Sequence, residues 1–347
     1  MAEYRQILSV LGAAALAAVF TGLLTSMVRR LAVRHGFVDV PRDGRRMHCR
    51  PVPNVGGVAI VAVFAVLCLM LGQRSRMELG ILAGGLVIAL LGFLDDRFDI
   101  PARYKLLVQI VAACIPVSQG CLISWIGLTE QIHICLGMVQ VPVTLLWIVA
   151  VTNAVNFIDG LDGLSSGICA LSSLGMILLL LWMDCREAAV LSGILLGCCL
   201  GFLPHNWNPA KIFMGDTGAT FLGFVLACLC AQGFYGRDAG VSPAVALLVL
   251  GVPLSDLCYA CLRRIKHHVS PMHPDRGHIH HMLVDVSGSQ CRSVLALYGV
   301  QLLLCTGAVT GGILGPLPAM GILLILAAVE GALLCRLSRS VGAGIRK

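Results

Sequence analysis

The sequence contains very few charged side chains. Only 12% of its 347 residues are Asp, Glu, Lys or Arg, whereas a soluble domain carries about 25%. Aromatic residues are also scarce, at 6%, while 58% of the chain is hydrophobic and the mean hydropathy is +0.89. This composition excludes an ordinary soluble protein and indicates that lipid surrounds most of the chain.

The sequence also lacks the patterns of a nucleic-acid-binding, zinc-binding or disulfide-bonded protein. The net charge is +7, but the basic residues are scattered through short loops without interleaved aromatic residues, so we expect no nucleic acid partner. Most of the 16 cysteines lie within apolar runs, where they are expected to pack as small apolar residues. Cys258 and Cys261 form a lone C-x-x-C motif with no second pair, so neither zinc nor redox chemistry is expected there.

Apolar runs of about 20 residues recur along the whole chain. They predict an all-α, polytopic transmembrane bundle of ten or eleven helices, with about eleven favoured, in one integral membrane domain over 1–347. The first run is too long for a signal-peptide core of about 7–15 residues, so it is retained as a span. The predicted spans are 6–28, 54–72, 79–94, 105–123, 134–154, 163–183, 188–204, 217–234, 241–262, 293–314 and 316–335.

The distribution of Lys and Arg predicts the orientation of this bundle. With the N-terminus outside and the C-terminus cytoplasmic, 20 of the 25 basic residues fall in cytoplasmic segments, as the positive-inside rule requires. There are seven in 29–53, three in 95–105, one in 205–216, five in 263–292 and four in 336–347. We therefore expect a multi-pass membrane protein with its C-terminus in the cytoplasm.

Five polar segments fall on this cytoplasmic side: 39–57, 95–105, 153–162, 205–216 and 263–292. The outer loops contain no comparable clusters of Asp, Asn and His. One active site facing the cytoplasm and built from these five loops is therefore expected. An ion-coupled transporter is a remote alternative, because it would place ionisable residues near the middle of the bilayer rather than at one face.

Two of these segments contain carboxylates that suit a divalent cation. Asp95 and Asp96 stand at the cytoplasmic end of the third predicted span, and Asp216 stands where the eighth begins, between two glycines. Mg²⁺ prefers a few carboxylate oxygens together with substrate phosphates, and a helix N-terminus also favours phosphate. Asp95 or Asp96 could also serve as a base. The alternative is that these residues only cap helices.

The remaining segments contain groups that suit a nucleotide. Asn156, Asp159 and Asp162 can hydrogen-bond a uracil edge or ribose hydroxyls, although Asp162 could instead cap a helix. Three clustered histidines can hydrogen-bond diphosphate oxygens, and zinc is the less favoured reading. A basic loop can dock an anion, or simply lie beside the inner leaflet. The histidines are His278, His280 and His281, and the basic loop contains Arg45, Arg46 and His48.

Four segments, in this order, carry a family resemblance: LGFLDDRFD, NAVNFIDGLDGL, NWNPAKIFMGDTG and DRGHIHH. The chain resembles the polyprenyl-phosphate N-acetylhexosamine-1-phosphate transferases of glycosyltransferase family 4, from Asp39 to about Tyr298. The resemblance implies ten or eleven transmembrane helices, a cytoplasmic active site, Mg²⁺ or Mn²⁺ as cofactor, and UMP as product. The early loop departs from the family pattern, with Arg46 for Lys, Val52 for Thr and Asn54 for Arg.

The resemblance also implies roles for individual residues. Asp95 and Asp96 match aspartates that serve the lipid phosphate and the metal, and Asp216 matches a metal-binding aspartate. Five positions match nucleotide-site or nucleoside-site residues, and three match the histidine motif near the diphosphate. The five are Asn156, Asp159, Asp162, Asn206 and Phe213, and the three are His278, His280 and His281.

The H-x-H-H form of the histidine motif is similar to that of the undecaprenyl-phosphate GlcNAc-1-phosphate transferases, whereas the MurNAc-pentapeptide branch typically has H-H-H. The resemblance therefore implies transfer of GlcNAc-1-phosphate from UDP-GlcNAc to undecaprenyl phosphate. This would be the first membrane step of a cell-envelope polysaccharide such as teichoic acid or O-antigen. UDP-MurNAc-pentapeptide or another UDP-N-acetylhexosamine is the alternative donor. A direct displacement is favoured over a phospho-aspartate intermediate, membrane lipid is an expected partner, and a homodimer is left open.

Overall fold

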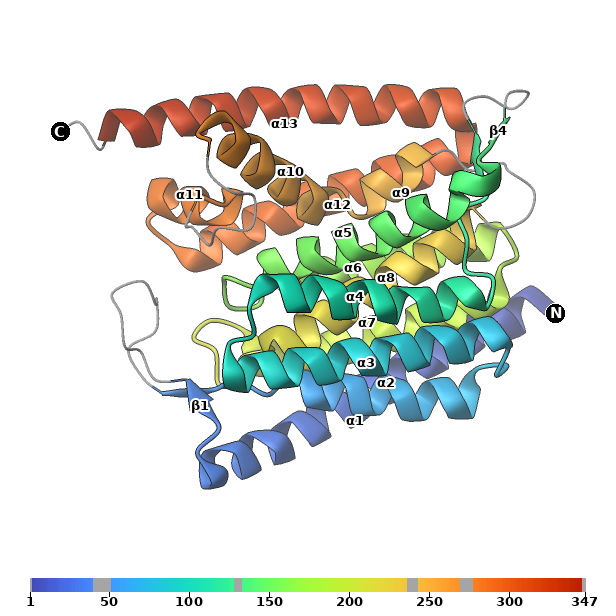
Figure 1. The fold of residues 1–347 in the computed structure, drawn as a ribbon, viewed down its shortest axis with the longest axis horizontal. Helices are drawn as coiled ribbons and strands as arrows, with labels where there is room; N and C mark the ends of the chain where they lie inside the picture. The colour runs from blue at the N-terminus through green and yellow to red at the C-terminus, as the bar shows by residue number, and fades with distance from the viewer. Residues whose placement is uncertain (1, 40–50, 128–132, 236–242, 269–276, 345–347) are drawn as a thin grey trace.

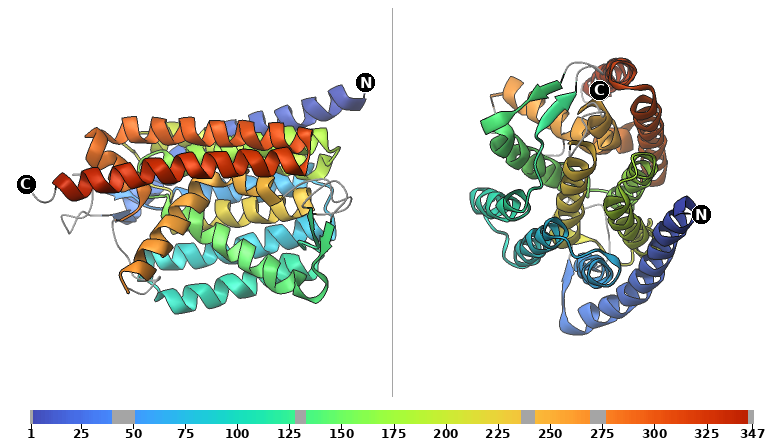
Figure 2. Two further views of the ribbon diagram at one scale, coloured as in Figure 1. Left: turned by 90° about the horizontal axis from the view of Figure 1, so that it is seen from above. Right: turned by 90° about the vertical axis from the view of Figure 1, so that its right-hand side faces the viewer.

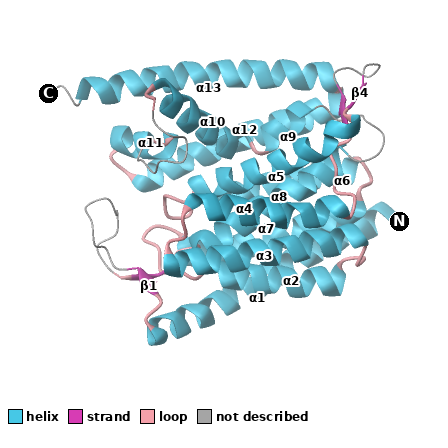
Figure 3. Ribbon diagram, in the orientation of Figure 1, coloured by secondary structure: helices cyan, strands magenta, loops and turns pink. Residues whose placement is uncertain are grey.

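The computed structural model describes residues 2–39, 51–127, 133–235, 243–268 and 277–344, and these are almost entirely helical (Figures 1 and 3). Two short antiparallel strand pairs join helices, with Val38 opposite Pro53 in one pair and Trp125 opposite Cys135 in the other. The helices are α1 (Ala2–His35), α2 (Gly57–Leu71), α3 (Arg76–Phe98), α4 (Ala102–Ser118), a 3-10 turn (Gly137–Val139), α5 (Gln140–Phe157), α6 (Leu164–Trp182), α7 (Arg186–Asn206), α8 (Gly215–Tyr235), α9 (Pro243–Val249), α10 (Gly251–Lys266), α11 (Ile279–Ser287), α12 (Gln290–Leu314) and α13 (Pro316–Gly344). The strands are β1 (Val38–Asp39), β2 (Val52–Pro53), β3 (Trp125–Gly127) and β4 (His133–Cys135).

Most of the long helices run along a common direction, so the connecting loops gather at the two ends of the bundle (Figures 1 and 2). The N-terminus and the β3–β4 hairpin lie at one end. The β1–β2 pair, the end of α3 and helix α11 lie at the other end. Chemistry-bearing loops that are far apart in the sequence therefore share one end of the molecule.

Six of the described helices are long and apolar enough to cross a membrane: α1, α3, α5, α6, α7 and α12. Shorter apolar helices occur at α2, in Gly215–Ala231 of α8 and in Leu317–Leu333 of α13. Many apolar side chains on these helices are exposed, including Leu23 of α1 and Leu146 of α5, which suits a lipid environment. The chain is therefore an all-α, multi-pass membrane protein, and the number of about eleven spans remains a prediction.

The predicted span 241–262 is not one continuous helix, because it is broken at Leu250 between α9 and α10. Pro253 has no backbone N–H to donate to the carbonyl of Val249, four residues earlier. That carbonyl instead accepts hydrogen bonds from Ser172 Oγ (2.8 Å) and Gln301 Nε2 (2.7 Å). Gln301 Oε1 in turn accepts from Val252 N (3.1 Å). The buried Gln301 thus supplies hydrogen-bond partners to backbone groups on both sides of the break. Hydropathy alone does not predict this break in the helix.

Other boundaries also differ from the sequence prediction. Residues 119–123 and 134–139, assigned to the ends of two spans, lie outside the long helices and flank the β3–β4 hairpin or belong to it. Helix α11 was expected only as part of a loop. Its Gly288, with φ of +65°, terminates it in the left-handed region that glycine tolerates.

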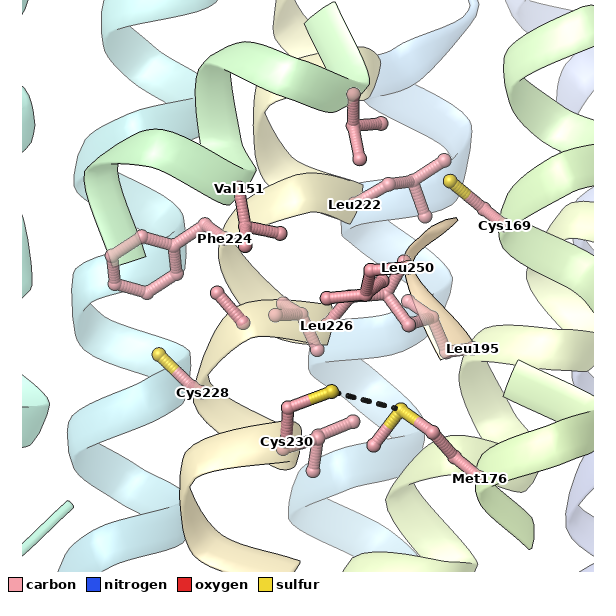
Figure 4. Packing of buried hydrophobic residues seen from close by; sticks show 14 of the residues in the cluster. Val151, Cys169, Met176, Leu195, Leu222, Phe224, Leu226, Cys228, Cys230 and Leu250 are labelled. Atoms are coloured by element: carbon pink, nitrogen blue, oxygen red, sulfur yellow. Dashed lines mark hydrogen bonds between the residues drawn. The ribbon is translucent and has the colours of Figure 1, made fainter. Parts of the chain in front are cut away.

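Helix α8 lies at the centre of the bundle, where it packs against α2, α3, α5, α6, α7 and α9. Its side chains from Phe221 to Ala231, apart from Gly223, are apolar and fully buried. Figure 4 shows Cys230 of this helix against Met176 of α6, with the two sulfur atoms 3.7 Å apart. Because α8 is enclosed on all sides, its first turn has a fixed position relative to the ends of its neighbours.

Close contact between α2 and α8 depends on paired glycines. A Cβ atom added to Gly57 would lie 2.2 Å from the backbone nitrogen of Gly218, and one added to Gly218 would lie 2.7 Å from the Cα of Gly57. The backbone of Gly57 also donates to the carbonyl of Met214 (2.8 Å). Neither helix can move away without breaking this contact.

We predict that Gly57→Ala destabilises the protein, because the added methyl group must displace the α8 backbone at a cost of about 1–3 kcal/mol. Thermal unfolding of the purified protein in detergent would show a lower midpoint. Gly12→Ala is the matched control, since a Cβ at Gly12 meets no atom within 4 Å. Equal midpoints for the two variants would contradict the proposed contact.

Candidate active site

The structure describes eleven of the fourteen predicted site residues. All eleven lie at the end of the bundle that holds the β1–β2 pair and α11. The other three, Arg45, Arg46 and His48, lie outside the described residues.

Asp96 at the end of α3 caps the first turn of α8. Its Oδ1 accepts from Asp216 N (2.9 Å), and its Oδ2 accepts from Thr217 N (3.2 Å) and Thr217 Oγ1 (2.9 Å). Asn54 Nδ2 also donates to Oδ1 (3.1 Å). The first N–H groups of a helix lack partners within the helix and carry partial positive charge, so a carboxylate stabilises them. This geometry makes Asp96 a positioning residue that fixes Asp216.

Asp95, Lys105 and Asp216 form the charged centre of the site. Lys105 Nζ makes a close ion pair with Asp95 Oδ2 and lies 3.5 Å from Asp216 Oδ2. Asp95 is buried and also accepts from Ile100 N (2.7 Å), whereas the Asp216 side chain is 34% exposed. Lys105 was missed by sequence reasoning as a site residue. The sequence signal for Lys105 is its position at the start of an apolar helix. In the sequence this position indicates only the orientation of the helix in the membrane.

The donor set at this centre fits a divalent cation. Asp95 and Asp216 share the ammonium of Lys105, and Asp96 bonds the first turn of α8 beside them, so three carboxylates lie close to one ammonium. Oxygen ligands from two carboxylates with open positions for phosphates are what Mg²⁺ prefers. Asp95 and Asp216 can offer these oxygens, because each oxygen of Asp96 already accepts two hydrogen bonds, whereas each oxygen of Asp95 has one partner among the described residues.

The loop before α2 completes this part of the site. Phe213 N donates to Pro53 O (2.8 Å), and Gly56 N donates to Phe213 O (2.9 Å). A small cavity of about 100 Å³ lies beside this pairing and is lined in part by Asn54, Asp96 and Arg97. The phenyl ring of Phe213 is half-buried.

Asn206 and Asp162 brace two loops against each other. Asn206 is buried; its Oδ1 accepts from Gly163 N (3.0 Å) and its Nδ2 donates to Ile212 O (3.1 Å). Asp162 Oδ2 accepts from Asn208 Nδ2 (2.8 Å) and Ala210 N (3.0 Å). Within the described chain both side chains are occupied by structural hydrogen bonds, so their geometry is that of positioning residues.

The side chains of Asn156 and Asp159 make fewer hydrogen bonds to described residues than those of Asn206 and Asp162. The side-chain amide of Asn156 makes no hydrogen bond to any other described residue and is partly exposed. Asp159 accepts a hydrogen bond from Ser165 Oγ. Burial, with a smaller contribution from the neighbouring carboxylates Asp96 and Asp162, raises the pKa of Asp159 to about 7 despite the Ser165 bond.

The histidines cluster around a buried aspartate that sequence reasoning missed. Asp256 of α10 is 2% exposed; its Oδ2 lies 2.8 Å from His278 Nδ1 and 3.6 Å from His280 Nδ1, and its Oδ1 accepts from Ile279 N (2.6 Å). The guanidinium of Arg264 lies 3.5 Å from His278 Nε2. Asp256 thus orients the imidazoles and anchors the start of α11. An aspartate in an apolar run was the only sequence signal.

Gly160 links the histidines to the other loops. A Cβ atom at Gly160 would lie 2.6 Å from His280 Nε2 and 3.5 Å from His281 Nε2. The described parts of the five polar segments therefore form one continuous series of contacts, from the pairing of β2 with Phe213, through the aspartates, to the histidines.

Comparisons with known proteins identify the family of this chain. The family model "Glycosyl transferase family 4" matches residues 78–233. The chain is 36% identical, over 83% of its length and 80% of the relative, to a protein of Bacillus subtilis (strain 168) named probable undecaprenyl-phosphate N-acetylglucosaminyl 1-phosphate transferase. The chain belongs to glycosyl transferase family 4.

Two further relatives in this family have related names. A decaprenyl-phosphate N-acetylglucosaminephosphotransferase of Mycolicibacterium smegmatis is 36% identical, covering 81% of this chain and 77% of the relative. An undecaprenyl-phosphate alpha-N-acetylglucosaminyl 1-phosphate transferase of Escherichia coli (strain K12) is 33% identical, covering 77% of this chain and 74% of the relative. The family assignment from the four motifs is confirmed.

We predict that Asp159→Asn makes stability less dependent on pH. The folded state raises the pKa of Asp159 to about 7, so between about pH 4 and pH 7 the folded protein holds a proton that the unfolded chain releases. Stability is therefore lost as the pH rises through this window. Asparagine cannot titrate and can still accept from Ser165, so the midpoint of Asp159→Asn should rise relative to wild type from pH 4 to pH 7.

Thermal unfolding in detergent at several pH values would measure this difference. Asp99→Asn is the control, because Asp99 is exposed and its backbone, with φ of 51°, tolerates asparagine. A constant difference between Asp159→Asn and wild type at every pH would show that Asp159 has an ordinary pKa.

Proposed function

We propose that this protein transfers GlcNAc-1-phosphate from UDP-GlcNAc to undecaprenyl phosphate, giving undecaprenyl-diphospho-GlcNAc and UMP. The observation that carries this proposal is the charged centre, in which two carboxylates from α3 and α8 share the ammonium of Lys105. With a divalent cation held by these carboxylates, such a centre would bind and neutralise phosphate groups, which is the main catalytic task in phosphoryl transfer. The relatives are named for the transfer of N-acetylglucosamine 1-phosphate to polyprenyl phosphates, which supports this sugar and this acceptor.

Asp95 and Asp216 would hold Mg²⁺, or Mn²⁺ in its place. When bound, the ion would supply charge neutralisation for the diphosphate of the donor. Asp96 keeps Asp216 in place through the first turn of α8. Lys105 holds a positive charge between the two ligands and can bind a phosphate oxygen of either substrate.

The reaction proceeds by direct displacement, with an oxygen of the lipid phosphate attacking the β-phosphorus of the donor. A phosphate monoester is already largely ionised near neutral pH, so the aspartates need not act as bases. Asp95 is buried and held by Ile100 N as well as by Lys105, which suits a ligand and orienting group better than an attacking nucleophile. The phospho-aspartate route is therefore the less favoured alternative.

Polar side chains of the site that make few hydrogen bonds within the described protein would bind the nucleotide. The free amide of Asn156 can hydrogen-bond the uracil edge or the ribose, and Asp159 lies in the same loop. His280 and His281 lie against Gly160 and would face the diphosphate, with Asp256 orienting the imidazoles. Asn206 and Asp162 would act indirectly, by bracing the loops around the nucleoside.

The site would face the cytoplasm, where UDP-sugars are available, with the N-terminus outside. The excess of Lys and Arg in the segments at this end supports that orientation. The product would then enter a cell-envelope polysaccharide such as a teichoic acid or an O-antigen.

The proposal predicts the donor preference of the purified enzyme. With undecaprenyl phosphate and Mg²⁺ in detergent, UDP-GlcNAc should release UMP, whereas UDP-MurNAc-pentapeptide and UDP-GalNAc should release at least about 10-fold less. Removal of divalent cations with a chelator should stop the reaction. A larger release of UMP from another donor would reassign the sugar, and no release from any donor would overturn the transferase proposal.

We predict that Asp216→Asn and Asp95→Asn each lower kcat by about 100-fold or more, because each removes an anionic ligand from the charged centre. Asp99→Asn is the matched control in the same acidic segment, since Asp99 is exposed and lies outside the charged centre. UMP release would be measured for variants that keep the wild-type midpoint of thermal unfolding. Near-normal turnover of Asp216→Asn would refute its role as a ligand.

A further inference from the structure

His278 precedes α11 and is buried between two charged side chains of α10. Its Nδ1 lies 2.8 Å from Oδ2 of Asp256, and its Nε2 lies 3.5 Å from the guanidinium of Arg264. Asp256 and Arg264 are themselves only 2% and 3% exposed. The imidazole is therefore enclosed by an anion on one side and a cation on the other.

The chemistry of these two neighbours determines where the proton of His278 lies. A guanidinium has only N–H donors, so the ring nitrogen that faces Arg264 must act as an acceptor. The carboxylate of Asp256 needs a donor on the other ring nitrogen. The neutral imidazole with its proton on Nδ1 meets both requirements, whereas an imidazolium or the opposite tautomer would direct an N–H group at Arg264. In the neutral form with its proton on Nδ1, His278 has no Nε2 proton to donate to a diphosphate.

The contact between Asp256 and His278 has the length of a hydrogen bond. Asp256, His278 and His280 offer three ligand atoms within 4.8 Å of one another, as a metal site would. Two ligands of one tetrahedral zinc ion, each at about 2.0–2.1 Å, lie about 3.3 Å apart. The observed separation of 2.8 Å is shorter, and the guanidinium of Arg264 would repel a cation. These contacts favour a proton over a metal ion between Asp256 and His278.

The same carboxylate fixes the first turn of α11, which carries the other two histidines. Oδ1 of Asp256 accepts from Ile279 N (2.6 Å), so one side chain holds both the imidazole and the start of the helix. His280 and His281 follow in this turn, with their ring centroids 4.3 Å apart. Their Nε2 atoms lie close to Gly160. A shift at the start of α11 would therefore move both rings away from the loop at Gly160.

Phe157 connects these residues to the nucleotide side of the proposed site. Its ring meets His278 edge to face, with centroids 5.4 Å apart, and the guanidinium of Arg264 lies 5.8 Å from the ring centroid. An aromatic face attracts a cation at this distance. Phe157 is the last residue of α5 and directly follows Asn156. The position of His278 thus bears on both the diphosphate side and the nucleoside side of the site.

We propose that His278 is a positioning residue, held as the neutral Nδ1–H tautomer between Asp256 and Arg264. His280 and His281 are then the histidines of this motif that contact the diphosphate. Arg264 is a second positioning residue, because its guanidinium requires Nε2 of His278 to be an acceptor. The kinetic consequence rests on the proposed transferase activity, whereas the tautomer does not.

Nuclear magnetic resonance of the purified wild type with ¹⁵N-labelled histidine tests the tautomer at neutral pH. The ¹⁵N chemical shift of each ring nitrogen shows whether that atom is protonated. The spectrum of His278→Asn lacks this ring and so assigns its signals. We expect a protonated Nδ1 and an unprotonated Nε2. A protonated Nε2, alone or together with Nδ1, overturns the proposal whether or not the protein transfers GlcNAc-1-phosphate.

The rate of UMP release from UDP-GlcNAc tests the positioning role. The amide of asparagine can replace Nδ1–H of His278 and still donate to Asp256, whereas the longer glutamine places its amide near the position of Nε2. We expect His278→Asn to keep kcat within about threefold of wild type, because the donor to Asp256 remains. His278→Gln should lower kcat by about 30-fold, because His280 and His281 lose their positions.

His35→Gln is the matched control at the same end of the bundle, since His35 ends α1 and is exposed. It should keep the wild-type kcat. The rates are compared for variants that keep the wild-type midpoint of thermal unfolding. A kcat of His278→Gln equal to or above that of His278→Asn would overturn the positioning role, because a contact through Nε2 favours glutamine. No UMP release by the wild type from any donor would instead refute the transferase proposal, and the ¹⁵N spectrum would still decide the tautomer.

Discussion

The hydrogen bonds from the first turn of α8 to Asp96 are the constraint on which the arrangement of the candidate active site depends. Helix α8 packs against six other helices, and Thr217 in its first turn is buried. The N–H groups of Asp216 and Thr217 therefore need acceptors from another segment, and the Asp96 carboxylate supplies both. One interaction thus fixes the end of α3, the start of α8 and the direction of the Asp216 side chain.

The same requirement explains how the remaining loops are held. Buried backbone and amide groups in a lipid-embedded bundle must find partners within the protein. Gln301 does this for the break between α9 and α10, and Asn206 does it for the loops before α6 and α8. The bonds from Gln301 to Val249 and Val252, and the bond from Gly163 to Asn206, join segments that are more than 40 residues apart. The buried polar residues therefore have two roles. Some form the candidate active site, and others, such as Asn206 and Gln301, hold backbone segments in place.

The sequence was sufficient to predict the helical membrane class and the meeting of the polar loops, because hydropathy and side-chain chemistry are local properties. It did not separate the roles within that site. Asp95 and Asp96 are neighbours in one motif, yet only the positions of Lys105 and α8 show that one faces the ammonium and the other caps a helix. Asp256 was missed for the same reason, since its partners His278 and His280 lie more than 20 residues later in the chain.

Unsatisfied polar atoms distinguish binding sites from structural ones more clearly than charge does in this protein. Some unpaired hydroxyls lie within helices, such as those of Thr21 and Thr25, where rotation towards a backbone carbonyl can satisfy them. Side-chain amides, imidazoles and carboxylates cannot be paired by a simple hydroxyl rotation of this kind. The side-chain amide of Asn156 is different, because it is partly exposed and bonds no other described residue. An accessible amide with unused donors and acceptor, among side chains whose polar atoms are already paired, is the group most available to a ligand at the candidate active site.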